Sequence, residues 1–66
     1  MTTDPQGNTI TATQPVEFTD TLTGAKIVGV VTSIEGGILL NVKGRRTTEI
    51  KDGNFQIHAN QVRANL

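Results

Sequence analysis

The chain has 66 residues, with six Lys and Arg against six Asp and Glu, one His and no Cys, Trp or Tyr. This length allows one small domain, since a chain this short buries only about 60% of the surface that its unfolded form exposes. Without Cys and with a single His, thiolate chemistry and zinc sites built from Cys or several His are excluded. A net charge of zero provides no overall attraction to nucleic acids or membranes.

The first segment, residues 1–14, consists mainly of Thr, Asp, Pro, Gln, Gly and Asn. Its large aliphatic residue, Ile10, buries too little apolar surface to offset the entropy lost on ordering the segment. We therefore expect a flexible arm over residues 1–14 and a folded domain over residues 15–66. The arm has neither a basic start nor an apolar run, so we expect no signal peptide, no membrane contact and a cytoplasmic location.

From Val16 onward, Val, Ile and Thr become frequent and Gly recurs at short intervals, which is typical of short strands joined by tight turns. Val16 to Thr19 alternates apolar and polar residues and predicts a half-buried strand. Lys26 to Ile34 is apolar on both faces and predicts a longer strand, with Gly29 as a point for a sharp bend. Glu35-Gly36-Gly37 then predicts a hairpin turn.

The second half of the chain predicts two more hairpin strands. Ile38 to Lys43 returns from the first hairpin, and Gly44 marks another turn or bulge. Arg45 to Ile50 alternates in a polar strand that we expect at an edge of the sheet. Asp52-Gly53 is a strong signal for a second hairpin.

The last part of the chain predicts how the domain ends. Phe55 to His58 forms a strand with Phe55 and Ile57 inward, Ala59 to Gln61 makes one 3₁₀ turn, and Val62 to Leu66 closes the structure. Short strands at even spacing predict an all-β fold, a small five-stranded barrel. The order of strands, hairpins and 3₁₀ turn resembles an SH3-like barrel, a fold that hosts many unrelated functions.

Two segments resemble a narrower family. Gly24-Ala25-Lys26-Ile27-Val28-Gly29 and Phe55-Gln56-Ile57-His58 are similar to parts of the plasmid-borne type II dihydrofolate reductases, tetrameric SH3-like barrels whose shared pore binds NADPH and dihydrofolate. The family's pore motif is Val-Gln-Ile-Tyr, so Gln56 and Ile57 match and His58 replaces Tyr. The resemblance implies, as an alternative function, an oxidoreductase with NADPH as cofactor and with Gln56, Ile57 and His58 lining the pore.

A second resemblance concerns the strand around Gly29. Gly29, Val31, Ile34 and Glu35 have a spacing similar to that of the Sm-like RNA-binding rings. Asn41 falls two positions late for the Asn that contacts a base in that family, so the resemblance implies no RNA-contacting residues here.

Although the net charge is zero, the acidic and basic residues are unevenly distributed along the chain. Residues 43–66 contain five basic and two acidic residues, whereas residues 1–42 contain one basic and four acidic residues. The basic residues of the last third are Lys43, Arg45, Arg46, Lys51 and Arg63. If the barrel brings them together, they form a basic patch suited to phosphate or an acidic partner; otherwise they are solvated charges that discourage strand pairing between molecules.

Two strands carry more apolar residues than one barrel interior can bury. Leu39, Val28 and Val30 face away from the predicted core. Either the arm covers them with Ile10, or a second copy of the chain does, and we expect a homo-oligomer.

The chain has few reactive side chains, so the leading hypothesis is a non-catalytic module without a cofactor. We expect it to bind a protein, or a nucleic acid, through Lys43, Arg45, Arg46, Lys51 and Arg63. Without Tyr or Trp as stacking platforms, the protein partner is favoured.

Overall fold

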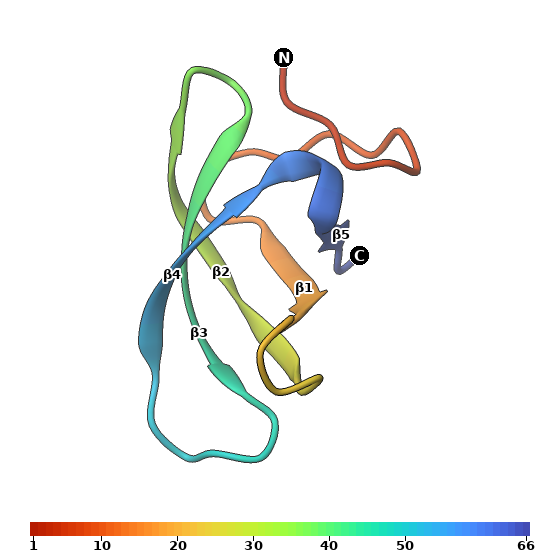
Figure 1. Ribbon diagram of the computed structural model, residues 1–66. Coiled ribbons are helices and arrows are strands. Elements are labelled where there is room, and N and C mark those ends of the chain that lie inside the picture. The colour runs from red at the N-terminus through yellow and green to blue at the C-terminus, as the bar shows by residue number, and fades with distance from the viewer.

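The computed structural model describes residues 1–66 and consists of five strands and one short 3₁₀ helix (Figure 1). The elements are β1 (Pro15–Thr19), β2 (Lys26–Glu35), β3 (Leu39–Arg46), β4 (Gly53–His58), η1 (Ala59–Gln61) and β5 (Arg63–Ala64). They form one antiparallel sheet in the order β4-β3-β2-β1-β5. The predicted all-β class and the number of strands are therefore confirmed, although one predicted strand is absent and β5 is the fifth. The sheet curves without closing, because β4 and β5 remain as its two edges.

The strand predicted over Arg45 to Ile50 is wrong. β3 continues through Gly44 to Arg46, and residues 47–52 form the connection to β4. The reason is that Gly44 lies directly opposite Gly29 of β2. A Cβ on Gly29 would lie 2.5 Å from the carbonyl oxygen of Lys43 and 2.7 Å from the Cα of Gly44. The two glycines thus permit a close approach of β2 and β3, and Gly44 does not end the strand.

The core lies on the concave side of the sheet and follows the alternation of the strands. Its ten buried apolar residues are Ile10, Val16, Phe18, Ile27, Val31, Leu40, Val42, Ala59, Val62 and Ala64. Phe55 and Ile57 of β4 face the same interior, as predicted, but they are only half-buried. The interior is therefore well covered under β1, β2 and β3 and open beside β4.

Residues 1–14 lie against the sheet near β5 (Figure 1). Ile10 is 2% exposed and belongs to the core. The backbone N–H of Ile10 donates to Thr2, and Thr13 and Gln14 form backbone hydrogen bonds with Val31. The composition did not predict these contacts, because polar and backbone hydrogen bonds, rather than apolar area, hold most of the segment. The flexibility of the arm itself stays a prediction.

Candidate binding surface

Lys43 and Arg45 lie on the convex face of β3, where the alternation of the strand directs both side chains to solvent. Lys43 is paired in register with Val30 of β2, and Arg45 is paired with Val28. Val30 is 41% exposed. Neither cation forms an ion pair in the structure. β2 and β3 thus present a strip of two free cations beside two valines, which we call the Lys43–Arg45 strip.

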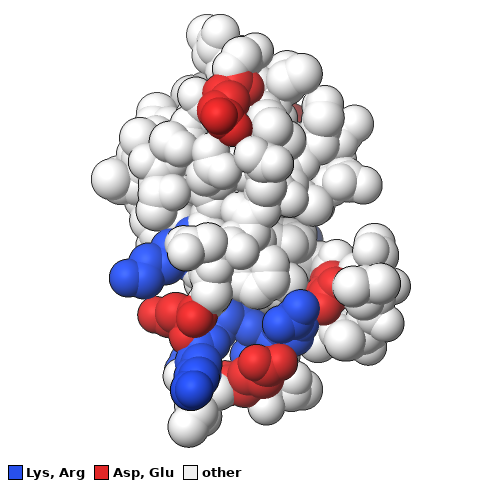
Figure 2. Space-filling view, turned by 60° about the vertical axis from the view of Figure 1, so that its left-hand side comes forward, with Lys and Arg blue, Asp and Glu red and all other residues white.

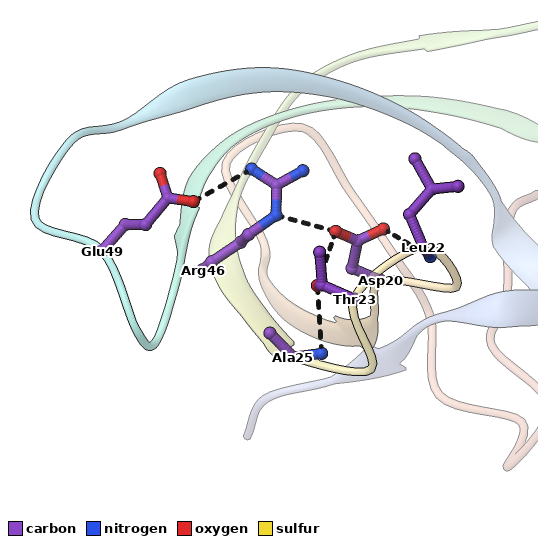
Figure 3. A network of polar contacts seen from close by, with 6 residues as sticks. All are labelled: Asp20, Leu22, Thr23, Ala25, Arg46 and Glu49. Carbon is purple, nitrogen blue, oxygen red and sulfur yellow. Dashed lines mark hydrogen bonds and ion pairs between the residues drawn. The ribbon is translucent and has the colours of Figure 1, made fainter.

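Arg46 points to the opposite side of β3 and has a different environment (Figure 3). Its Nε donates to Oδ2 of Asp20 at 2.7 Å, and its Nη1 lies 3.5 Å from Oε1 of Glu49. The guanidinium carbon lies 5.4 Å from the centre of the Phe55 ring. The hydrogen bond that Arg46 donates to Asp20, which outweighs partial burial, raises the pKa of Arg46 above its ordinary value. Arg46 therefore connects β3 to the loop between β1 and β2.

Asp20 organises that loop from the other end of the ion pair (Figure 3). Its carboxylate accepts hydrogen bonds from the backbone N–H of Leu22 and from the hydroxyl of Thr23, at 3.1 and 3.0 Å. The hydrogen bond from Arg46, followed by those from Leu22 and Thr23, lowers the pKa of Asp20 below its ordinary value. This carboxylate is occupied by partners within the fold, so it is poorly placed to act on a ligand.

The other predicted cations, Arg63 and Lys51, lie outside the strands that form the Lys43–Arg45 strip. Arg63 is on β5, paired in register with Glu17 of β1, and Lys51 is in the connection between β3 and β4. Glu17 also forms an ion pair with Lys26. The hydrogen bond from Lys26, opposed by partial burial and assisted by the charges of Lys26 and Arg63, lowers the pKa of Glu17.

Figure 2 shows the consequence for the surface on this side of the molecule. Lys and Arg side chains gather in the lower half of the view, with Asp and Glu side chains between them, while the upper half is uncharged except for acidic side chains. The five predicted cations do not all lie on one face of one strand pair, because Arg46 points to the concave side and Arg63 is on β5 at the other edge of the sheet from β4. The structure brings together Lys43 and Arg45 and pairs Arg46 with carboxylates.

A polar network that the sequence did not predict lies on the same convex face, across β2, β3 and β4. Nδ2 of Asn41 donates to Oγ of Ser33 at 2.9 Å and to Oε2 of Glu35 at 3.3 Å. Nε2 of Gln56 donates to Oε2 of Glu35 at 3.0 Å and to Oδ1 of Asn41 at 3.3 Å. The strand register places these residues together, and register is not visible in local spacing.

The three residues of the predicted pore motif do not share one face. Gln56 and His58 point to the convex face, and Ile57 packs against the core. The ring Nδ1 of His58 accepts a hydrogen bond from the backbone N–H of Asn60 at 3.4 Å, which caps η1. His58 is therefore engaged in holding the turn that leads to β5.

An open cavity of about 340 Å³ lies beside β4 on the concave side. Phe18 and Ile27 contribute to its walls from β1 and β2, and Phe55 and Ile57 contribute from β4. The rings of Phe18 and Phe55 pack edge to face, with centroids 6.0 Å apart. The cavity is the place where the interior remains accessible next to the edge of the sheet.

The structure contains no group of side chains that fits a metal ion and no helix that fits a membrane span. No three His, Cys, Asp or Glu side chains lie together as a metal ion would require. None of the helical segments has the length and apolar character needed to cross a membrane. In comparisons with known proteins, no family model, curated protein or solved structure matches the chain.

Proposed function

We propose that the protein is a non-catalytic binding module that binds an acidic, extended segment of a partner protein on the Lys43–Arg45 strip. The observation that carries the proposal is that Lys43 and Arg45 lack carboxylate partners, whereas Arg46 and Lys26 have them. Carboxylates of a partner would supply the missing counter-charges, and Val28 and Val30 would add apolar contact.

The fold proposed for this module is an SH3-like barrel in an open form. Two features support it: β1 pairs with both β2 and β5, and one 3₁₀ turn separates the last two strands. Because this fold hosts unrelated functions, the proposed binding rests on the strip alone.

The test is a titration of isotope-labelled protein with an acidic peptide of Glu and Val, followed by NMR. We expect saturable shifts at Lys43, Arg45 and Val30, and weaker binding as salt is raised. The double variant Lys43→Gln/Arg45→Gln should weaken binding by roughly tenfold or more, since each charge-assisted contact contributes about 1.5–3 kcal/mol.

The matched control removes the same charge elsewhere, with Lys51→Gln/Arg63→Gln. We expect a much smaller loss, and an equal loss in both double variants would show unspecific attraction and contradict the proposal. A parallel titration with single-stranded RNA distinguishes the other partner class. Tighter, steeply salt-dependent RNA binding at the same residues would replace the protein partner with a nucleic acid.

A second candidate is the NADPH-dependent oxidoreductase implied by the dihydrofolate reductase resemblance. One observation favours it: Gln56 is held on an exposed face by hydrogen bonds to Glu35 and Asn41, with His58 beside it on β4. Such a site would act by positioning donor and acceptor. NADPH titrated into the protein should then bind saturably, and absence of saturable binding by a confirmed tetramer removes this candidate.

A further inference from the structure

The two edges of the sheet are protected very differently. At β5 the strand is only two residues long, and the backbone N–H of Ala64 donates to Oδ2 of Asp4 at 2.9 Å. The arm therefore covers this edge. β4 is six residues long and pairs only with β3, and Figure 1 shows no segment beyond it.

β4 has backbone groups that find no partner within the sheet. The N–H of Ala59 donates to the carbonyl of Ile38, in the same register that pairs Ile57 with Leu40. Since hydrogen-bonded pairs alternate along an antiparallel ladder, Phe55 and Ile57 direct their backbone groups to β3. Asn54, Gln56 and His58 therefore direct theirs to the open edge.

No residue of β4 is of a type that blocks pairing with another strand. Gly53 to His58 contains no Lys, Arg, Asp, Glu or Pro, which are the residues that usually block an exposed edge. Phe55 and Ile57 are only half-buried beside the open cavity. An added strand would satisfy the backbone groups and cover both side chains.

We infer that the occupant of this edge is β4 of a second copy of the chain, paired antiparallel about a two-fold axis at Gln56. In that register Phe55 lies opposite Ile57 of the second copy on the concave side, where each fills the other's open cavity. Asn54 lies opposite His58 of the second copy on the convex side. Each copy meets the other with the same unsatisfied edge, as an isologous interface requires.

Charge also permits this pairing of identical chains. The protein has zero formal charge, so two copies experience no overall repulsion. The nearest interior cation, Arg46, already has Asp20 and Glu49 as partners. The dimer is thus a sheet that continues from one copy into the other, and it buries the apolar surface that the arm leaves open.

The experiment measures the mass of the full chain by sedimentation velocity over a range of concentrations. We expect a dimer. In Gln56→Lys, two lysines face each other at the axis, so the dissociation constant should rise by more than about tenfold and the mass should halve. Asn41→Lys places the same charge one strand inward on the same face and disturbs the same polar network, so it should remain dimeric.

The decisive experiment mixes the Gln56→Lys and Gln56→Glu variants. Each variant alone should be monomeric and retain the circular dichroism of the wild type, and the mixture should restore a dimer because opposite charges then meet at the axis. A wild-type monomer at every concentration overturns the inference. So does a dimer that Gln56→Lys leaves intact, since its interface would then lie on another surface.

Discussion

Asp4 shows how one polar side chain attaches the arm to the sheet. It is 4% exposed, and its carboxylate accepts hydrogen bonds from Ala64, Asn8 and Gln6. Burial by itself would raise the pKa of Asp4, but the backbone N–H groups of Ala64 and Asn8, with the Asn8 amide and Gln6, outweigh it and lower the pKa below its ordinary value of 3.8. The charged form is therefore the one that the fold favours.

The arm should consequently loosen in acid. A carboxyl whose pKa is lowered by folding stabilises the folded state above its unfolded pKa, and this contribution is lost as pH falls through the folded value. We expect the amide shift of Ala64, followed by NMR, to titrate with a midpoint below 3.8. Asp4→Asn should abolish this titration, and Asp52→Asn in the exposed loop should leave it unchanged. A midpoint at or above 3.8 would contradict the prediction.

Arg46 illustrates why residue type alone did not define the binding surface. By sequence it is one of two adjacent arginines, yet the two side chains leave β3 on opposite faces. Arg45 faces solvent on the convex side, and Arg46 bridges Asp20 and Glu49. Alternation on a strand separates neighbours, and only the extension of β3 through Gly44 decided which neighbour faced which way.

The pair of β2 and β3 depends on the contact between Gly29 and Gly44. A Cβ on Gly44 would collide with the carbonyl of Val28, and one on Gly29 would lie 2.9 Å from a methyl group of Val42. Backbone atoms in a paired strand cannot move aside without breaking the ladder. The glycines are therefore required by space, not by turn conformation.

We expect Gly29→Ala and Gly44→Ala each to lower the free energy of unfolding by about 1–3 kcal/mol or more, the usual cost of overpacking. Gly53→Ala is the matched control at the start of β4, because its Cβ would meet the Phe55 ring at an ordinary 3.6 Å. That variant should stay within about 0.5 kcal/mol of the wild type. Urea denaturation measures all three, and equal stability of Gly44→Ala and Gly53→Ala would refute the steric explanation.

β4 is the element whose role depends most on what surrounds it. Its outward residues, Gln56 and His58, belong to an exposed polar face, and its inward residues, Phe55 and Ile57, border the open cavity. The alternation was readable from the sequence. The open edge was not, because it depends on the order of strands in the sheet.

The molecule as a whole includes the arm in its core. Thr2 and Asp4 are buried as well as Ile10, and the arm supplies contacts to β5 and to the backbone of β2. For a domain of this size, total stability is only about 3–10 kcal/mol. One buried aliphatic side chain in the arm is then a large fraction of that total.

Ile10→Ala should therefore destabilise the whole domain by about 2–5 kcal/mol, as expected for truncating a buried Ile. Leu22→Ala, at a position 89% exposed in the loop between β1 and β2, should change stability by less than about 0.5 kcal/mol. Thermal unfolding followed by circular dichroism compares the two. If both variants unfold at the same temperature as the wild type, the arm contributes nothing to the stability of the fold.

Local information in the sequence determined the elements of this protein. Alternation of Val, Ile and Phe with polar residues, together with the Gly36-Gly37 turn, specified the all-β class, most strands and the inward side of β4. These features act between residues a few positions apart. They are therefore readable without knowing what lies across the sheet. The tight turn predicted at Asp52-Gly53 is wrong, because residues 47–52 form the connection and Gly53 already belongs to β4.

Only the tertiary structure decided which residues meet. Register brought Ser33, Glu35, Asn41 and Gln56 into one network, the extension of β3 through Gly44 placed Arg45 and Arg46 on opposite faces, and the hydrogen bond from Ala64 to Asp4 attached the arm to β5. These outcomes depend on close contacts between distant segments, such as Gly29 with Gly44, that local patterns do not encode. The zero net charge of the chain is distributed in a specific way: Lys26 and Arg46 are paired with carboxylates within the fold, whereas Lys43 and Arg45 are exposed together on one face without such partners.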